Sequence, residues 1–331
     1  MKVTFLGTGS ATPSRSRNVT SIALQLPEQG TLWLFDCGEG TQHQILRSPL
    51  RLSQLERIFI THLHGDHLYG LPGLLASRSL QNGGISPVTI YGPAGIEEYV
   101  RVSLSASHSR PSYPIEVRTI QEGILYEDSR FTVQAAPMRH RLEAYGFAIQ
   151  EKPLPGQFNV AMARSLGIPE GPLYGLLKAG KDITLTDGRV IHGRDLLGAP
   201  RPGRRFVSCG DTTYTQTAVE LAKDADFLIH EATYLHSELQ QAIRGQHSTA
   251  VMAANVAKQA GAHKLALTHF SARYETSAQL NALLEEAREI FPNTILAYDF
   301  LTVEIEKRIA PDPVSISPNF RTDQLNTNSD I

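Results

Sequence analysis

Short apolar runs that alternate with helical patterns are the feature that most constrains how this chain can fold. Ten runs of five to seven residues have the apolar and β-branched content of strands, and five segments have apolar residues at helical spacing. The predicted strands are 2–7, 21–26, 31–36, 57–62, 88–92, 131–136, 205–211, 226–231, 264–270 and 294–299, and the predicted helices are 70–81, 94–106, 216–223, 248–260 and 276–290. The alternation predicts an α/β fold in which helices cover the sheets.

Composition excludes several classes of protein. With 331 residues, 41% hydrophobic and 19% charged, the chain is not disordered, collagenous or a coiled coil as a whole. Its two cysteines exclude a disulfide framework and a cysteine-rich zinc finger, and they suit a reducing compartment, so we expect a cytoplasmic location. The start MKVTFLGTGS lacks the features of a signal peptide, and no apolar run reaches membrane-spanning length, so no membrane contact is expected. A net charge of −2 does not by itself indicate a nucleic-acid-binding protein, although total charge says nothing about local patches. No DNA partner is expected.

Residues 152–205 differ in composition from the rest of the chain. They contain nine basic and four acidic residues, a net charge of +5, which leaves −7 on the remaining residues. Nine glycines and six prolines in these 54 residues break long elements and predict an extended, mobile excursion. An ordinary long surface loop is the alternative, but the basic RPGRR at 201–205 favours a function. Residues 308–331 are polar and aperiodic, which predicts a disordered tail.

The run ITHLHGDHLYG contains the strongest functional signal. It places four titratable side chains within six residues at the end of a predicted strand: His62, His64, Asp66 and His67. On an extended strand end His62 and His64 point the same way, because side chains alternate. A tight turn at Gly65 then redirects the other two, so one loop can supply two ligands to each of two adjacent metals. Imidazole and carboxylate ligands without thiolate suit zinc, with manganese or iron as the alternative.

Further titratable side chains fall near the ends of other predicted strands. Asp211 and His269 lie at or just after such ends, and His140 follows another strand after four residues. The ends of strands are the usual place for the active site of an α/β protein, so we expect these side chains to share one site.

The HxHxDH pattern after a strand resembles the signature of the metallo-β-lactamase superfamily, whose fold is a four-layer αββα sandwich with the metal site on one rim. This resemblance implies such a fold over 1–307. It also implies a later histidine, a bridging aspartate and a final histidine, found here in APMRHR, SCGDT and LTHFS. The implied ligand sets are His62, His64, His140 and Asp211 for one zinc, and Asp66, His67, His269 and Asp211 for the other.

Narrower blocks resemble the short form of the ribonuclease Z family, the endonucleases that trim tRNA 3′ ends. They are FLGTGSATPS near the N-terminus, DCGEGTQ (36–42), HEAT (230–233), HST (247–249), HFSARY (269–274) and PSRSRN (13–18), in which Arg15 stands where the family usually has lysine. The basic insert lies where that family inserts a flexible tRNA-binding arm. The resemblance implies a zinc-dependent endoribonuclease that removes 3′ trailers from precursor tRNA with a metal-activated water and leaves a 3′-hydroxyl. It also implies a homodimer with two zinc ions per subunit.

Three residues are candidates for proton transfer. Two metals about 3.5–4 Å apart can activate a water near neutral pH and stabilise charge on a phosphoryl group. Asp66 is the candidate acceptor for the proton of this water, with a role as ligand alone as the alternative. The resemblance suggests His247 as the general acid for the leaving ribose oxygen, oriented by Glu231. Alternatively, both residues position metal-bound histidines.

Other residues are candidates for holding the substrate. Ser271 and Arg273 follow the last predicted ligand and could hold the scissile phosphate, with a plain surface position for Arg273 as the alternative. The remaining predicted contacts with precursor tRNA are Arg15 and Arg17 in the N-terminal loop and Lys178 and Lys181 in the insert.

A phosphodiesterase for small phosphodiesters is the main alternative function, because the same two-metal centre would cleave such esters. A generic hydrolase of this superfamily has no need for a basic mobile insert, so that insert favours the nuclease.

Overall fold

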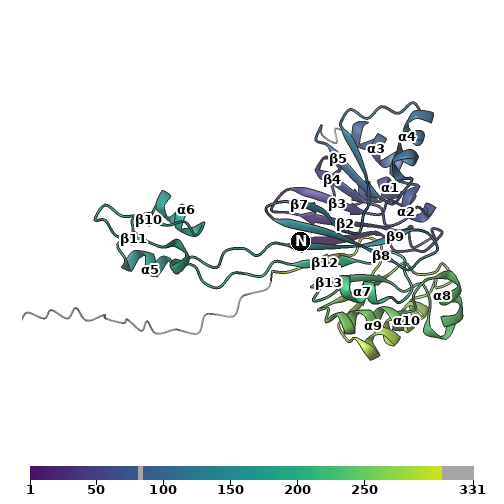
Figure 1. Ribbon diagram of the computed structural model, residues 1–331. Coiled ribbons are helices and arrows are strands. Elements are labelled where there is room, and N and C mark those ends of the chain that lie inside the picture. Colours follow the sequence, from purple (N-terminus) through teal and green to yellow (C-terminus); the bar gives the residue numbers. More distant parts are fainter. Residues whose placement is uncertain (81–84, 308–331) are drawn as a thin grey trace, which may run out of the picture. The chain divides into compact units, whose positions relative to one another are not determined.

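The computed structural model describes residues 1–80 and 85–307, and the tail predicted at 308–331 lies outside them. The described part of the chain divides into two compact units. The main unit consists of Met1–Lys152 and Gly203–Lys307, and the inserted unit is Pro153–Pro202. Figure 1 labels the helices and strands of both units.

The first sheet of the main unit joins an antiparallel half to a parallel half. Its strands, in order, are β16 (Thr302–Glu304), β1 (Lys2–Gly7), β2 (Ser21–Leu26), β3 (Thr31–Phe35), β4 (Leu55–Phe59), β5 (Val88–Gly92) and β6 (Ile115–Thr119). From β16 to β3 the neighbours pair antiparallel, and from β3 to β6 they pair parallel. All residues of the central parallel strand β4 except Glu56 are buried, as expected for a strand that is covered on both sides.

The second sheet has its parallel strands at one end. Its strands, in order, are β15 (Thr294–Leu296), β14 (Leu265–Thr268), β13 (Phe227–Glu231), β12 (Arg205–Ser208), β9 (Ala144–Glu151), β8 (Phe131–Met138) and β7 (Gly123–Glu127). The strands from β15 to β12 are parallel. β9 is antiparallel to both β12 and β8, so β8 runs in the same direction as β12. The ends of β8, β12, β13 and β14 therefore meet at one edge of this sheet.

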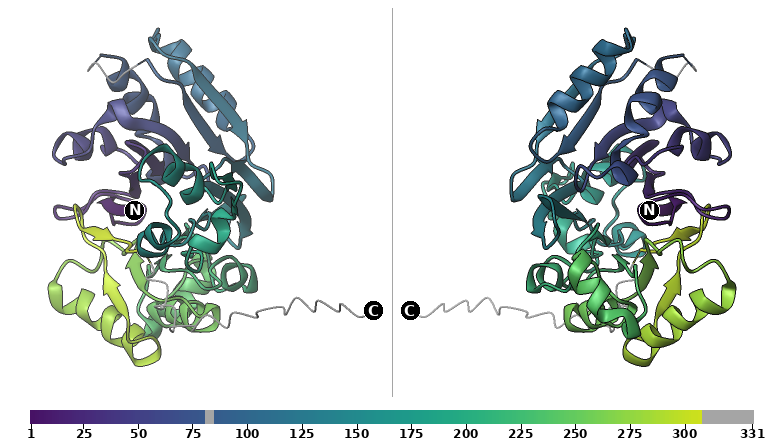
Figure 2. Two further views of the ribbon diagram at one scale, coloured as in Figure 1. Left: turned by 90° about the vertical axis from the view of Figure 1, so that its left-hand side faces the viewer. Right: turned by 90° about the vertical axis from the view of Figure 1, so that its right-hand side faces the viewer.

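Helices cover the outer faces of both sheets (Figures 1 and 2). On the first sheet lie α1 (Thr41–Leu46), α3 (Leu71–Leu80) and α4 (Ile96–Ala106), and on the second lie α7 (Gln216–Leu221), α9 (Ala250–Ala260) and α10 (Ser277–Ile290). Shorter elements are η1 (Leu52–Gln54), α2 (Gly65–Leu68), η3 (His236–Glu238) and α8 (Leu239–Gly245). No helix in the described ranges is long and apolar enough to span a bilayer.

Aromatic side chains fill the space between the two sheets. Phe35 and Phe59 of the first sheet stack with their ring centroids 5.1 Å apart. Phe147 and Phe206 of the second sheet pack against them, with ring centroids at 5.3 Å in each closest pair. Such pairs each add about 0.5–1.5 kcal/mol beyond the burial of their area. With helices outside and this core inside, the main unit has the four-layer αββα architecture predicted from the sequence.

The inserted unit is folded, which corrects the expectation of an extended excursion. It contains α5 (Val160–Ser165), α6 (Pro172–Lys178), the short strands β10 (Ile183–Thr184) and β11 (Val190–Ile191), and η2 (Gly193–Leu196). The side chains of Phe158, Tyr174 and Leu177 form part of its own small core. Most of the prolines and glycines lie between these elements or at their ends: Pro172, for example, is the first residue of α6, where its missing N–H leaves no hydrogen bond unmade.

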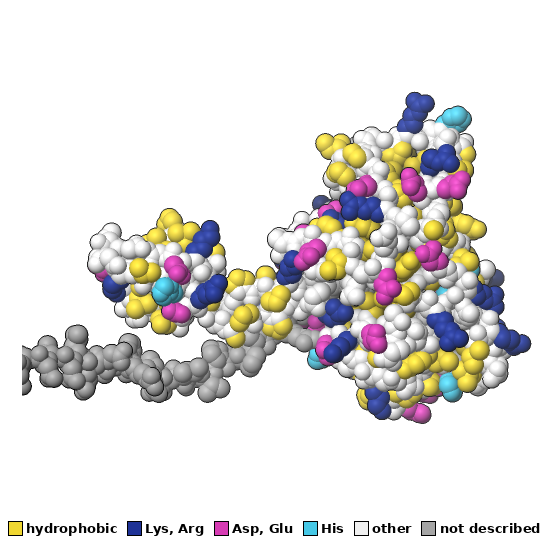
Figure 3. All heavy atoms as spheres, viewed as in Figure 1, with side chains coloured by type: hydrophobic (Ala, Val, Ile, Leu, Met, Phe, Trp, Pro, Cys, Tyr) yellow, Lys and Arg dark blue, Asp and Glu magenta, His cyan; other side chains and the backbone are white. Residues whose placement is uncertain are grey.

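The structure also changes the charge available on this unit. Lys152 pairs with Glu127 at 2.7 Å, and Arg204 pairs with Glu151 at 2.7 Å, all within the main unit. Arg205 also belongs to the main unit. Residues 153–202 hold six basic and four acidic side chains, a net charge of +2 rather than +5. Figure 3 shows basic side chains interspersed with acidic and apolar ones on the visible face of this unit.

Candidate metal centre and active site

The predicted ligands follow strands whose ends meet at one edge of the main unit. β4 precedes the run from His62 to His67, β8 precedes His140, β12 precedes Asp211, and β14 precedes His269. The structure brings all seven predicted ligand side chains together at this edge, in groups whose ligand atoms lie within 4.8 Å of one another.

The local geometry of the first ligand run differs from the prediction. β4 ends at Phe59, so His62 and His64 lie in the loop that follows and not on a strand. Gly65 does not form the predicted tight turn, because it begins α2 without a positive φ. Asp66 is the second residue of α2 and His67 the third. Their side chains therefore leave the helix about 100° apart, and both still belong to one group of ligand atoms within 4.8 Å.

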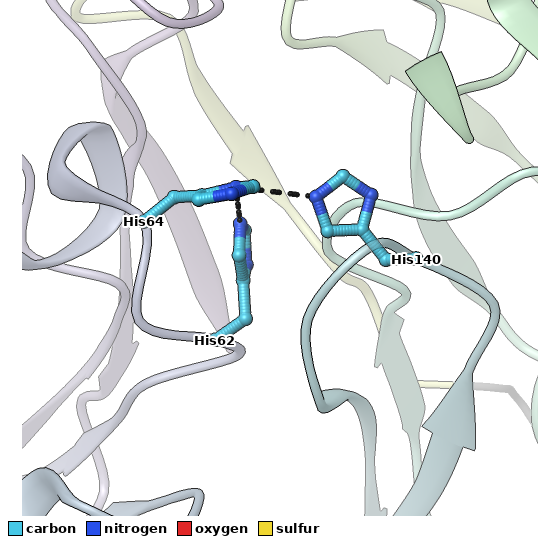
Figure 4. Close-up of side chains that lie close together, drawn as sticks. All are labelled: His62, His64 and His140. Carbon is cyan, nitrogen blue, oxygen red and sulfur yellow. Dashed lines mark hydrogen bonds between the residues drawn. The ribbon is translucent and has the colours of Figure 1, made fainter. Parts of the chain in front are cut away.

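Three histidines form the first cluster (Figure 4). His62 Nε2 lies 2.9 Å from His64 Nδ1, and His140 Nε2 lies 3.2 Å from the same His64 nitrogen. Figure 4 shows the three rings converging from the loops after β4 and β8.

Hydrogen bonds on the far side of the rings determine which nitrogen faces inward. His140 Nδ1–H donates to the Gln246 carbonyl at 3.0 Å, and His62 Nδ1 lies 2.9 Å from Thr61 Oγ1. The Thr61 hydroxyl donates to Asp36, so it accepts from His62. Both histidines therefore direct an Nε2 lone pair into the cluster, which is the arrangement that metal-ligating histidines adopt.

The second cluster combines imidazoles with carboxylates. His67 Nε2 lies 3.3 Å from His269 Nε2, 3.4 Å from Asp211 Oδ2 and 3.5 Å from Asp66 Oδ2. His67 Nδ1 lies 2.7 Å from Asp36 Oδ2, and His269 Nδ1 lies 2.9 Å from Thr233 Oγ1.

Asp211 lies between the two clusters. Its Oδ2 is 3.3 Å from His269 Nε2 and 3.8 Å from His62 Nε2. One buried carboxylate oxygen is therefore near donors of both clusters, as a bridging ligand would have to be.

Electrostatics of the centre favour a bound cation. Burial, together with the charge of His67, lowers the pKa of His62 to about 2, so its lone pair is available at neutral pH. Burial alone would raise the pKa of Asp211, but His269 and His67 outweigh it and hold that pKa well below its usual range. Burial lowers the pKa of His67, but the carboxylates of Asp211 and Asp36 outweigh it and raise that pKa. The negative charge that stabilises a proton on His67 would equally stabilise a metal ion.

These donors fit a divalent metal. In the first cluster the Nε2 lone pairs of His62 and His140 both face Nδ1 of His64. Nδ1 of His64 can carry only one proton, so it cannot donate a hydrogen bond to both lone pairs, whereas a metal ion can bind all three nitrogens. Imidazole and carboxylate donors suit zinc, and their outer hydrogen bonds supply the orientation that metal ligands need. The centre is therefore able to bind metal.

Glu231 and His247 form a pair at the border of this centre. His247 Nδ1–H donates to Glu231 Oε1 at 2.8 Å, and Glu231 also accepts from the backbone N–H groups of Thr212 and Ser248. Burial lowers the pKa of His247, but the Glu231 carboxylate outweighs it and raises that pKa to about 9. A cation bound nearby would act in the opposite direction.

A cavity of about 440 Å³ opens onto the centre. His64, Asp66, Asp211, His247 and His269 line it together with the loop 10–13, Glu39 and Tyr69. The backbone N–H of Ala11 donates to Asp66 Oδ2 at 2.7 Å, which fixes this carboxylate at the cavity wall. A small phosphodiester would fit this space.

The predicted substrate contacts lie in different surroundings. Arg17 is 5% exposed and donates to the Tyr274 carbonyl at 2.6 Å, so its guanidinium is not free to bind a phosphate. Arg273 pairs with Glu238 and donates to Gln241 at 2.8 Å. Arg15 is exposed and Ser271 is half-buried in the main unit, while Lys178 and Lys181 are exposed on the inserted unit.

Sequence reasoning missed the residues that orient the ligands. Thr61, Thr233 and Gln246 each bind the outer nitrogen of a predicted ligand. Thr61 directly precedes His62, and Thr233 lies in the HEAT block, so both stood inside motifs already noted. Gln246 acts through its backbone carbonyl, for which a sequence carries no side-chain signal.

The fold and the site together define a class of protein. The structure is similar to the metallo-β-lactamase fold protein YhfI from Bacillus subtilis, with a TM-score of 0.64 and 19% identity, over 91% of this chain and 98% of that chain. The main unit thus has a metallo-β-lactamase fold with a candidate metal centre at its edge. Residues 1–154 also match the family model described as Anti-Pycsar protein Apyc1.

More similar relatives identify the family. The chain is 54% identical to a ribonuclease Z from Cyanothece sp. over 319 residues, which covers 96% of this chain and 99% of the relative. It is 32% identical to the crystal structure of the short form of human tRNase Z (ELAC1), with a TM-score of 0.68, over 92% of this chain and 100% of that chain. The chain belongs to the ribonuclease Z family, and the resemblance drawn from its motifs is confirmed.

Proposed function

We propose that this chain is a metal-dependent endoribonuclease that removes 3′ trailers from precursor tRNA. The observation that carries the proposal is the pair of clusters sharing Asp211, beside the His247–Glu231 pair, in a member of the ribonuclease Z family. Such a centre can hydrolyse a phosphodiester and leave the tRNA with a 3′-hydroxyl.

Two zinc ions per subunit are part of this proposal, with manganese as the alternative. His62, His64, His140 and Asp211 would hold one ion, and Asp66, His67, His269 and Asp211 the other. Bound there, the metals would supply Lewis-acid stabilisation of phosphoryl charge and a nucleophile at neutral pH.

Asp66 is the residue proposed to orient the attacking water and to accept its proton. The Ala11 N–H holds its Oδ2, and the side chain lines the cavity. Burial raises the pKa of Asp66, but His67 and His269 outweigh it and lower that pKa, so the carboxylate is ionised at neutral pH. An ionised carboxylate can accept a hydrogen bond, and then a proton, from the water.

His247 is the residue proposed to protonate the leaving 3′ oxygen. Glu231 binds its Nδ1, which leaves Nε2 to carry a proton, and the ring lines the cavity. The hydrogen bonds that Glu231 accepts from His247, Thr212, Ser248 and Thr233 fix the carboxylate and with it the ring. An alkoxide is a poor leaving group, so proton donation at this atom would speed the reaction.

Binding of the tRNA is proposed to involve residues of both units. Lys178 and Lys181 on the inserted unit are exposed cations that can bind RNA phosphates, and Arg15 and Ser271 are the candidates on the main unit. Arg273 could serve only if its pairing with Glu238 were exchanged for a phosphate. A homodimer, which rests on the family resemblance, and a cytoplasmic location, which rests on the low cysteine content, complete the proposal.

One assay tests the proposal against the small-phosphodiester alternative. The purified protein is given a 3′-extended precursor tRNA and, separately, bis(p-nitrophenyl) phosphate. Cleavage of the precursor directly after the discriminator nucleotide, with a 3′-hydroxyl on the tRNA, supports the nuclease. Hydrolysis of the aryl ester without cleavage of the precursor would support the alternative.

A further inference from the structure

Tyr69 is a large exposed aromatic residue beside the candidate metal centre. It directly follows α2, the helix that carries Asp66 and His67. Tyr69 lines the same cavity as Asp66 and His247, which are proposed to transfer protons. The residue is 66% exposed, which is unusual for a tyrosine so close to a buried centre. Neither the proposed ligands nor the proton-transfer groups include it.

The Tyr69 ring lies against the backbone of Gly65. A Cβ atom at Gly65 would come within 2.2 Å of Tyr69 Cε2 and 2.5 Å of Cζ, so a side chain at this position would displace the ring. This close approach explains why a glycine stands between His64 and Asp66, where the turn expected from the sequence does not occur. One part of the ring is thus supported by backbone and the rest is exposed.

The backbone of Tyr69 is fixed as firmly as the ring. Its N–H donates to the Gly65 carbonyl at 2.9 Å, and the next residue, Gly70, donates to the Cys37 carbonyl at 2.9 Å. A Cβ at Gly70 would meet the Gly38 carbonyl oxygen at 2.1 Å, so two backbone segments are in direct contact here. Tyrosine has few rotatable bonds, and a ring held in this way loses little entropy when a ligand packs on it.

A fixed, exposed aromatic ring at the wall of a phosphodiester-cleaving cavity fits a nucleobase. Bases stack on aromatic side chains without requiring a particular sequence, and single-stranded RNA is commonly recognised in this way. Tyr69 lines the same cavity of about 440 Å³ as Asp66 and Asp211, so a base that reaches Tyr69 belongs to a nucleotide next to the scissile phosphate.

We propose that the Tyr69 ring stacks on the nucleobase of one of the two nucleotides that flank the scissile phosphate. This inference rests on the proposed function, since it needs an RNA substrate. Stacking would position the phosphate over the centre and restrict cleavage to a linkage with an unpaired base beside it. Tyr69 is thus a substrate-binding residue that tolerates every base.

The experiment compares three precursor tRNAs that differ in one base. The first is intact, the second lacks the base of the last retained nucleotide, and the third lacks the base of the first trailer nucleotide. Each is cleaved by the wild-type protein and by Tyr69→Phe, Tyr69→Leu and Tyr298→Leu. Tyr298 is a matched control, because it is 61% exposed on the main unit and does not line the cavity.

Removing the stacked base and removing the Tyr69 ring should each lower kcat/KM by the same factor, and removing both should lower it no further. Stacking of one base is expected to raise kcat/KM about 5- to 150-fold. The wild-type protein should lose this factor when one of the two bases is removed, and that position identifies the nucleotide. Tyr69→Leu should lose the same factor on intact precursor and lose nothing more on that abasic one. Tyr69→Phe and Tyr298→Leu should stay within about twofold of the wild type on every precursor.

Other results would overturn the inference. If both abasic precursors are cleaved as fast as the intact one, no base is stacked. If Tyr69→Leu lowers metal content or melting temperature, or slows all three precursors while still discriminating between them, the ring only supports the Gly65 backbone. If the wild-type protein does not cleave even the intact precursor, the proposed function itself is wrong. This outcome is distinguished from a failure of the stacking inference, because it is seen on the intact precursor alone.

Discussion

At the scale of single residues, the centre depends on hydrogen bonds that hold several of the proposed ligands from the side away from the cluster. Asp36 shows this arrangement. Its carboxylate accepts from the Thr61 N–H at 2.7 Å and lies 2.7 Å from His67 Nδ1, so one residue orients ligands of both clusters. Asp36 holds a left-handed backbone with φ of 58° to do so. Strain of this kind is expected where function requires it.

Asp211 is the residue whose loss should affect both metals at once. Because residues that only orient a ligand contribute about 10–100-fold to metal affinity, removing a shared ligand by Asp211→Ala should cost at least that much. We expect this variant to lose metal and to hydrolyse neither precursor tRNA nor bis(p-nitrophenyl) phosphate. Metal analysis of the purified variant, with activity on both substrates, measures this. Retained metal with full activity would refute the bridging role.

His247→Ala should separate proton donation from metal binding. The imidazole is not in the proposed ligand sets, so metal content should remain that of the wild type. Turnover of precursor tRNA should fall by about 10²–10⁴ if the ring protonates the leaving oxygen. p-Nitrophenolate leaves without a proton, so bis(p-nitrophenyl) phosphate should be hydrolysed with a much smaller loss. An equal loss on both substrates would instead favour a structural role for the pair with Glu231.

At the scale of elements, the sequence predicted the position of most central strands and helices. Each of the ten predicted strands and five predicted helices overlaps an observed element, because strands covered on both faces are continuous apolar runs. Four strands of the two large sheets were not predicted: β6, β7, β9 and β16. Of these, β9 contains a glycine, Gly146. A Cβ there would meet Met138 and Leu221 at 2.8 and 2.9 Å, so this glycine permits close packing and does not break the strand.

The candidate site was predictable to a similar extent. The ligand set followed from one motif and a family resemblance, but the local geometry did not. Gly65 begins a helix and contacts Tyr69, a contact that depends on tertiary packing. Arg17 was expected to bind substrate, yet it is buried against the Tyr274 carbonyl, which no motif indicates. The folded inserted unit was likewise hidden, since its glycines and prolines stand at the ends of very short elements.

The ion pair between Glu151 at the end of β9 and Arg204 before β12 is expected to hold these strands together. Both side chains are almost fully buried, at 2% and 3% exposed. Arg204→Met leaves the Glu151 charge buried without its partner, so it should lower the free energy of unfolding by about 3–5 kcal/mol. Lys152→Met is the control, because its pair with Glu127 is largely exposed and should contribute about 0–1 kcal/mol. Urea unfolding at pH 7 measures both.

The same pair predicts a pH dependence. Burial raises the pKa of Glu151, but hydrogen bonds from Arg204 outweigh it and lower that pKa from the usual 4.5. A carboxyl whose folded pKa is lowered stabilises the fold above its unfolded pKa, and this contribution is lost as pH falls through the folded pKa. In Arg204→Met the guanidinium is gone, so burial raises the pKa of Glu151 above 4.5 in the folded variant. The stability difference between wild type and Arg204→Met should therefore begin to shrink above pH 4.5 and continue to shrink as the pH falls through the lowered pKa of the wild type. A difference that stays constant down to pH 3 would assign the effect to packing instead of charge.

At the scale of the whole molecule, the proposed chemistry belongs to the main unit alone, whereas the proposed contacts with tRNA belong to both units. Every proposed ligand and proton-transfer group belongs to the main unit, whereas Lys178 and Lys181 belong to the inserted unit, which has its own core. Contacts that only bind the tRNA should change KM and leave the chemical step unaltered. Replacing residues 155–195 by a short Gly/Ser linker should therefore impair tRNA processing severely and leave hydrolysis of bis(p-nitrophenyl) phosphate close to normal.

The two lysines allow a sharper form of this prediction. Each phosphate neutralised by a cation adds about 0.7–0.9 to the slope of log K against log salt. If Lys178 and Lys181 each bind one phosphate, the double variant Lys178→Ala, Lys181→Ala should lower the slope by about 1.6. Over a fourfold rise in salt, the affinity of the variant for tRNA should then fall by a factor roughly ninefold smaller than that of the wild type. Arg164→Ala, Arg189→Ala is the matched control: it removes the same charge, but these arginines pair with Glu170 and Asp187. Its slope should fall less, and equal changes in both variants would show that net charge alone attracts the RNA.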